Sequence, residues 1–160
     1  MNLIALAESK GLLICAAESL TAGRVATEIA NTPGASKVFL GSIVSYSDSS
    51  KVSLLGVASE LIATNTAVAA EVALQMAVGV RDKFAQDNTS LKRQVVALST
   101  TGVAGPEPVR GNPIGLVFIG IASERGTRVV SLEFPGTRAE ISDQATGAAI
   151  ALLREELEQI

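Results

Sequence analysis

Two hydroxyl-rich segments of this chain have the residue types for acyl-transfer chemistry. The first, residues 18–23, reads Glu-Ser-Leu-Thr-Ala-Gly, and the second, residues 46–51, reads Tyr-Ser-Asp-Ser-Ser-Lys. Histidine is the usual base that activates a serine hydroxyl, and the chain contains none. If a serine acts as the nucleophile, another group must accept its proton, and a lysine is the obvious candidate.

A third cluster, residues 100–106, combines two threonines with two glycines and a proline. Each of the three clusters follows an apolar run that is typical of a strand, and ligands of open α/β sheets bind at the carboxyl ends of strands. Two of the clusters also precede expected helix starts, where free N–H groups attract anions. Convergence in one cleft would suit a phosphorylated substrate or a developing oxyanion.

Each feature also has a structural explanation when it is taken alone. Serine before a helix is more often an N-cap than a nucleophile. Lys51 fits a solvated surface lysine, Tyr46 fits strand-end packing, and Glu18 fits a structural anion bonded to nearby N–H groups. Arg138 fits a surface residue in the first turn of the last helix, and the glycines of the third cluster fit a tight turn. Dinucleotide and phosphate-loop motifs are absent, so neither a dinucleotide cofactor nor ATP is indicated.

The elements that must position these clusters follow from hydrophobic spacing and from Gly and Pro breaks. Strands are predicted over residues 12–17, 37–46, 95–99, 116–122 and 128–134, and helices over 2–10, 21–30, 47–55, 68–84 and 137–158. Residues 86–94 are predicted to form a surface loop. Alternating strands and helices with one hairpin predict an α/β fold, a three-layer α/β/α sandwich with a mixed, mostly parallel sheet of about five strands. Residues 1–160 are expected to form a single domain.

The overall composition makes some classes of function less favourable for this protein. Hydrophobic residues make up 48% of the 160 residues, aromatics only 3%, and 13 basic residues are mixed with 16 acidic ones for a net charge of −3. Nucleic-acid binding is disfavoured because it needs clustered positive charge and often stacking platforms. One cysteine, Cys15, and no histidine leave too few soft ligands for a zinc or iron–sulfur site, so no metal is expected.

The sequence also gives expectations for the cellular location and the assembly of the protein. No stretch reaches the roughly 18 to 20 apolar residues that cross a bilayer, and no signal peptide is recognisable. We therefore expect a cytoplasmic protein without membrane contact. The abundant Ala, Val and Leu faces leave a homo-oligomer open.

Taken together, the short motifs resemble those of a known family. They are Ala17-Glu18-Ser19-x-Thr21-x-Gly23, Tyr46-Ser47-x-x-x-Lys51 with Leu55-Gly56-Val57, Thr101-Gly102-Val103-Ala104-Gly105-Pro106, Pro113-x-Gly115 and Gly136-x-Arg138. In order and spacing they resemble the CinA carboxy-terminal domain family, the nicotinamide mononucleotide deamidases. The similarity covers essentially the whole chain.

The resemblance implies an α/β/α fold with a mixed sheet and hydrolysis of the carboxamide of nicotinamide mononucleotide to nicotinate mononucleotide and ammonia. The partner is then a phosphorylated pyridine nucleotide, and no cofactor is implied. Ser19 becomes the nucleophile and Lys51 its base, with Tyr46 placed to orient Lys51 or relay a proton. The expected substrate-binding residues are Thr21, Gly23, Thr101, Gly102, Gly105 and Arg138.

The sequence departs from the family pattern at several positions. Leu20 and Ala22 stand where the family commonly has Cys and Gly, and residues 107–109 read Glu-Pro-Val in place of Asp-Gly-Gly. Asn112 replaces a lysine or similar residue. These departures keep two other functions open: a non-catalytic nucleotide-binding or regulatory module on the same fold, and a serine amidase for another small amide.

Overall fold

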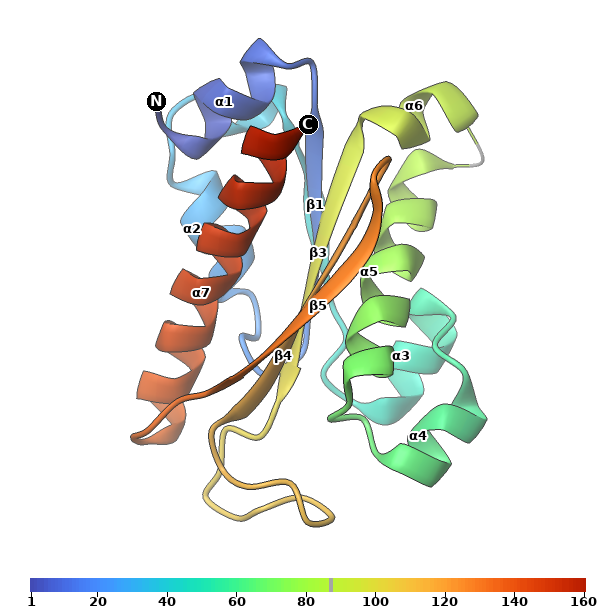
Figure 1. Cartoon of the computed structure of the whole chain (residues 1–160), viewed down its shortest axis with the longest axis vertical. Helices are drawn as coiled ribbons and strands as arrows, with labels where there is room; N and C mark the ends of the chain where they lie inside the picture. Colours follow the sequence, from blue (N-terminus) through green and yellow to red (C-terminus); the bar gives the residue numbers. More distant parts are fainter. Residues whose placement is uncertain (87) are drawn as a thin grey trace.

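Five strands form one mixed sheet between two layers of helices, as the computed structural model shows for residues 1–86 and 88–160 (Figure 1). The strands are β1 (Leu13–Glu18), β2 (Phe39–Val44), β3 (Val95–Gly102), β4 (Leu116–Ser123) and β5 (Gly126–Glu133). Their order across the sheet is β2-β1-β3-β4-β5. Strands β2, β1 and β3 run parallel, whereas β3, β4 and β5 are antiparallel. The predicted three-layer α/β/α fold with a mixed sheet is confirmed.

The helices divide between the two faces of the sheet. They are α1 (Leu3–Ser9), α2 (Arg24–Ala30), α3 (Asp48–Leu55), α4 (Ser59–Asn65), α5 (Ala70–Ala85), α6 (Thr89–Gln94) and α7 (Arg138–Gln159), with a short 3₁₀ helix over Ala35–Lys37. Figure 1 shows α1, α2 and α7 on one face and α3 to α6 on the other. In residues 1–86 and 88–160, no helix combines the length and apolar content needed to cross a bilayer.

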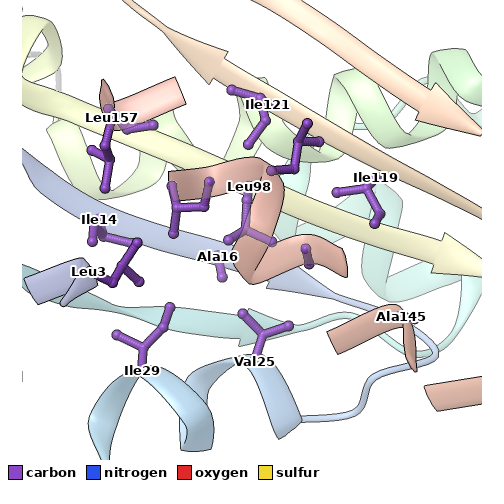
Figure 2. Close-up of a cluster of buried hydrophobic side chains, with 14 of the residues drawn as sticks. Leu3, Ile14, Ala16, Val25, Ile29, Leu98, Ile119, Ile121, Ala145 and Leu157 are labelled. Carbon is purple, nitrogen blue, oxygen red and sulfur yellow. The ribbon is translucent and has the colours of Figure 1, made fainter. Parts of the chain in front are cut away.

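Burial on both faces of the sheet explains why the sequence of β1 is a nearly continuous apolar run. Ile14 and Ala16 belong to the core on the α7 side, whereas Cys15 and Ala17 belong to the core under α5. Successive side chains alternate across a sheet, so a strand buried on both faces is apolar along most of its length, and in β1 only the last residue, Glu18, is charged. Figure 2 shows the α7-side core, where Val25 of α2 and Ala145 of α7 lie over the strand residues. Each fully buried Ile or Leu there contributes about 1.5–3 kcal/mol to folding.

The predicted surface loop over residues 86–94 is wrong for its second half. Residues Thr89–Gln94 form α6, and the side chain of Asn88 caps this helix by accepting from the Leu91 N–H at 3.0 Å. The polar composition of the segment favoured a loop. The one sequence feature that indicates this short helix is its N-cap residue. Residue 87 lies outside the described residues.

Strand β3 is longer than its composition predicts, and this matters for the third cluster. The Gly- and Pro-rich segment was expected to leave the sheet after Ser99, yet pairing with β4 continues through Gly102 opposite Val117. A Cβ at Gly102 would lie 2.7 Å from the Leu116 carbonyl oxygen, so the close pairing requires glycine. Thr101 is therefore fixed by the sheet rather than by a loop.

Two helix glycines should respond in opposite ways to alanine. A Cβ at Gly79 in α5 would lie 1.9 Å from the carbonyl oxygen of Leu55 in α3, whereas a Cβ at Gly147 in α7 would meet nothing within 4 Å. We expect Gly79→Ala to lower the free energy of unfolding by about 2–3 kcal/mol, because the clash exceeds the roughly 1 kcal/mol gain in helix propensity. Gly147→Ala should instead raise it by up to about 1 kcal/mol. Urea unfolding measures both, and equal effects of the two changes would contradict this packing.

Candidate active site at the carboxyl ends of β1 and β3

A cavity of about 240 Å³ opens at the carboxyl ends of β1 and β3 and brings the three polar clusters together. Its lining includes the predicted site residues Ser19, Tyr46, Lys51, Thr101, Gly102, Gly105 and Arg138, with Asp48 and Glu107 as its acidic members. A larger hollow of about 770 Å³ lies beside α5, but its Lys83 is exposed. None of the residues predicted for the site lines this hollow. Among residues 1–86 and 88–160, no group of three or more Cys, Asp or Glu side chains could hold a metal ion.

Lys51 is buried, so its interpretation as a solvated surface lysine is wrong. It lies one turn into α3, which Ser47 caps by accepting from the Ser50 N–H at 3.1 Å. Only 1% of Lys51 is exposed, and its Nζ donates to the carbonyl oxygens of Ser45 at 3.0 Å and Tyr46 at 3.1 Å. Burial lowers the pKa of Lys51 below its ordinary value, and the nearby Asp48 carboxylate opposes this shift. Burial therefore makes the neutral amine easier to reach for Lys51 than for a solvated lysine.

Ser19 directly follows β1 and is almost as deeply placed. It is 8% exposed, and its N–H donates to the Thr100 carbonyl oxygen at 3.0 Å, which extends the β1–β3 pairing by one residue. The next carbonyl, that of Leu20, accepts from the Ser142 hydroxyl of α7 at 3.0 Å. In the part of the chain that the structure describes, no hydrogen bond joins the Ser19 hydroxyl to Lys51, although both side chains line the cavity. Catalytic hydrogen bonds are often long before substrate binds.

Glu18 is the buried anchor of the turn that follows β1. Its carboxylate is fully buried and accepts from the N–H groups of Gly23, Val25 and Ala26 at 2.8, 3.1 and 2.9 Å. The interpretation of Glu18 as a structural anion is confirmed. The start of α2 is thus occupied by the protein's own carboxylate.

Thr21 and Gly23 consequently do not reach the cavity. The Thr21 hydroxyl donates to Glu18 at 2.8 Å, and the Gly23 N–H is used by the same carboxylate. Neither residue belongs to the cavity lining. The Thr21 hydroxyl and the Gly23 N–H therefore shape the turn instead of facing a substrate in the cavity.

Arg138 and Tyr46 meet across the mouth of the cavity. The Arg138 guanidinium donates to the Tyr46 hydroxyl at 3.1 Å and to the carbonyl oxygen of Gly105. Arg138 is the first residue of α7, which begins with a capping box formed by Thr137 and Glu140. Tyr46 is 55% exposed and contacts Lys51 through its backbone carbonyl. Tyr46 therefore orients Lys51 with its main chain and Arg138 with its side chain.

The loop between β3 and β4 forms the remaining wall. The Thr101 hydroxyl donates to the Ala67 carbonyl oxygen at 2.7 Å, which ties β3 to the segment before α5. Asn112 donates to the Thr66 hydroxyl at 3.2 Å and to the Val68 carbonyl at 3.1 Å. Asn112 thus holds the loop against the α4–α5 connection, which gives this departure from the family pattern a structural role.

A match to a protein-family model shows the family of this chain. The family model described as the CinA C-terminal domain matches residues 1–157. The chain belongs to the CinA C-terminal domain family. A CinA-like protein of Frankia casuarinae is 40% identical over 144 residues, covering 90% of this chain and 31% of that protein. A CinA-like protein of Geotalea daltonii is 38% identical over 148 residues, covering 92% of this chain and 34% of that protein. This CinA domain spans about a third of the length of these relatives.

Solved structures of the CinA superfamily share the fold. A competence or damage-inducible protein from Enterobacter asburiae superposes with a TM-score of 0.87 at 26% identity, covering 97% of this chain and 93% of that one. A competence/damage inducible protein from Agrobacterium tumefaciens has a TM-score of 0.73 at 30% identity, covering 99% and 96%. The architecture that carries the cavity is therefore a family property.

The two departures beside Ser19 are accommodated in this CinA domain. Ala22 adopts a φ of 48°, in the left-handed region where glycine is favoured. An L-residue there costs about 1 kcal/mol relative to glycine, which the surrounding hydrogen bonds offset. Leu20 is 5% exposed and forms part of the cavity wall. Neither change displaces Ser19 from the cavity.

Some functional neighbours were not singled out from the sequence. The carbonyl groups of Ser45 and Ala67 hold Lys51 and Thr101, but backbone acceptors leave no trace in residue type. Ser142 could have been found from the sequence. It lies four residues after Arg138 and therefore on the same face of α7.

Proposed function

We propose that this CinA domain hydrolyses the carboxamide of nicotinamide mononucleotide to nicotinate mononucleotide and ammonia. The observation that carries the proposal is the shared cavity, whose lining combines an alcohol, Ser19, a buried amine, Lys51, and a guanidinium, Arg138. The substrate joins an amide to a phosphate, so it needs a nucleophile with a base at one end and a cation at the other. Its pyridinium ring is cationic, which suits the acidic lining residues Asp48 and Glu107.

The contacts of Lys51 support its role as the base. A neutral amine has two N–H bonds and one lone pair. The carbonyl oxygens of Ser45 and Tyr46 take both N–H bonds, which leaves the lone pair for the proton of the Ser19 hydroxyl. The same two carbonyl groups also stabilise the ammonium that forms when the proton is transferred.

The reaction then runs through an ester of Ser19. As the Ser19 oxygen bonds to the carboxamide carbon, its proton moves to Lys51, and the carbonyl oxygen becomes an oxyanion. The carbon–nitrogen bond breaks while Lys51 returns the proton to the departing nitrogen, which releases ammonia. Water attacks the ester while Lys51 accepts one of its protons. The carbon–oxygen bond then breaks as Lys51 returns this proton to the Ser19 oxygen, and the acid product releases its own proton to solvent to give the carboxylate.

Thr21 and Gly23 do not line the cavity, so the oxyanion needs a donor at another position. The Leu20 N–H follows the nucleophile, as oxyanion donors do in other serine hydrolases. It makes no hydrogen bond to another residue within 1–86 and 88–160. We assign it as the oxyanion donor, a role in which a single donor contributes about 3 kcal/mol to the transition state.

The charges of the site orient the substrate. Glu18 fills the start of α2, so a phosphate cannot use those N–H groups. Arg138 is the basic residue at the mouth, whereas Lys51 is buried and donates to the carbonyl oxygens of Ser45 and Tyr46. We therefore propose that Arg138 binds the phosphate and that the carboxamide lies at Ser19.

Removal of the Arg138 guanidinium should weaken substrate binding without disabling the chemistry. We expect Arg138→Met to raise KM for nicotinamide mononucleotide about 10- to 100-fold, because a charge-assisted phosphate contact is lost, and to change kcat less than about threefold. Steady-state ammonia release measures both constants. Arg154→Met, at the far end of α7, is the matched control. With nicotinamide riboside, which lacks the phosphate, Arg138→Met should leave KM nearly unchanged; an equal rise for both substrates would contradict the orientation.

Ammonia release from nicotinamide mononucleotide, measured beside calorimetric binding, tests the proposal. Turnover of this substrate in preference to amides without phosphate supports it. Binding without turnover would instead support a regulatory module, and turnover of unphosphorylated amides alone would support a different serine amidase.

A further inference from the structure

We infer that Glu18 is a positioning residue of the active site, whose carboxylate fixes residues 19–23 so that the Ser19 hydroxyl is held toward Lys51. The inference rests on the proposed function. Residues 19–23 are called the nucleophile turn below.

The Glu18 carboxylate has a complete set of partners. Its Oε2 accepts from the Thr21 hydroxyl and from the N–H groups of Gly23 and Val25, while its Oε1 accepts from the Ala26 N–H and the Ser42 hydroxyl, both at 2.9 Å. These donors come from the nucleophile turn, from α2 and from β2. One side chain therefore joins three segments that surround Ser19.

The alternation of β1 separates the anchor from the nucleophile. Glu18 ends the strand and extends toward α2, and Ser19 continues the pairing with β3 and lines the cavity on the α3 side. Neighbouring residues of an extended strand point to opposite faces. A shift of the Glu18 side chain would therefore move the Ser19 hydroxyl through the shared backbone, without any contact to substrate.

A second hydrogen-bonded chain ties the nucleophile turn to β3. The Thr21 hydroxyl gives its proton to Glu18, so the Thr100 hydroxyl, 2.8 Å away, donates to Thr21. The Thr100 carbonyl also accepts from the Ser19 N–H. Ser19 thus lies between Glu18 and the Thr100 backbone, and the Thr21 hydroxyl links the side chains of these two residues.

Glu18→Gln tests the inference with almost no change in volume. All five partners of the carboxylate donate, so the amide nitrogen of glutamine must face at least one backbone N–H, either that of Ala26 or those of Gly23 and Val25. We expect kcat for nicotinamide mononucleotide to fall about 100-fold, the loss that a misplacement of about 1 Å produces. KM should change less than about twofold, because Arg138 and the β3–β4 loop are untouched. Glu28→Gln, on the exposed face of α2, is the matched control and should keep wild-type rates.

Thr21→Val provides a second, milder test that does not depend on the folding of Glu18→Gln. It removes the hydroxyl that links Glu18 to Thr100 and keeps the shape of the side chain. We expect kcat to fall about tenfold with an unchanged KM. A rise in KM without a change in kcat would instead assign Thr21 to substrate binding and overturn the positioning role of this network.

The labelling rate of Ser19 by a fluorophosphonate separates this inference from the proposed function. We expect Glu18→Gln to lower kcat and the labelling rate by the same factor. Its affinity for nicotinamide mononucleotide, measured by calorimetry, should stay at the wild-type value. A kcat and a labelling rate within about threefold of wild type would overturn the inference while the proposed function stands. If the wild-type protein is labelled at Ser19 but releases no ammonia, the proposed function fails and the relative labelling rates alone decide on Glu18. A wild-type protein that is neither labelled nor active overturns both.

Discussion

Ser19→Ala is expected to lower kcat for ammonia release from nicotinamide mononucleotide by a factor of at least about 10⁴, because loss of the nucleophile removes the covalent route altogether. The dissociation constant of the substrate should change less than about threefold, since the hydroxyl contributes little to ground-state binding. Coupled detection of ammonia gives the rate, and calorimetry on the same protein gives the affinity.

The control for this change is Ser36→Ala, which alters an exposed serine outside the cavity. It should leave both constants at wild-type values. Full ammonia release by Ser19→Ala would remove this residue from the mechanism. Loss of binding together with loss of rate would indicate a disturbed cavity rather than a missing nucleophile.

Lys51→Met should lower kcat by about 10³-fold, within the range that a positioned general base contributes. Methionine has a similar length and no titratable group, so the buried volume of Lys51 stays filled. The exposed Lys83→Met change on α5 is the matched control and should be silent. Retention of more than about a third of the wild-type kcat in Lys51→Met would exclude Lys51 as the base.

The pH dependence of the rate should report the same amine. The base form of Lys51 is required, and its pKa lies below the ordinary value of 10.5. We therefore expect kcat of the wild-type protein to rise about tenfold per pH unit at low pH and to level off before pH 10.5. A profile that is flat from acid to neutral pH, or that still rises at pH 10.5, would contradict this assignment.

Stability should depend on pH through Lys51 with a defined sign. The folded-state pKa is below the unfolded-state value, so between the two the unfolded chain binds more protons and the free energy of unfolding rises with pH. The rise amounts to at most about 1.4 kcal/mol per pH unit and ends near the unfolded pKa. Lys51→Met should lack this rise, and denaturant unfolding across this pH range compares the two proteins.

The features that could be predicted from sequence are those encoded locally. Ser47 as the cap of α3 and Thr137 with Glu140 as a capping box follow from residue types within one helical turn. The convergence of the three polar clusters followed from the rule that the carboxyl ends of parallel strands share one edge of the sheet. That rule holds here because β1 and β3 are parallel neighbours.

The features that could not be predicted depend on packing between distant elements. Lys51 reads as a surface residue within α3, and only the packing of that helix against α5 and the end of β2 buries it. The exclusion of Thr21 and Gly23 from the cavity depends on which donors the Glu18 carboxylate reaches after folding. The length of β3 depends on its antiparallel partner β4, which overrides the local preference of a Gly- and Pro-rich segment.

The most direct test of the central claim is a crystal structure of Ser19→Ala with intact nicotinamide mononucleotide. The expected result places the carboxamide carbon above the alanine methyl group, within about 3.5 Å of the position that the Ser19 oxygen would take. Lys51 should lie within a direct or one-water contact of that position, and the phosphate should lie on Arg138. A ligand bound in the hollow beside α5, or one whose carboxamide points away from Lys51, would contradict the proposed active site.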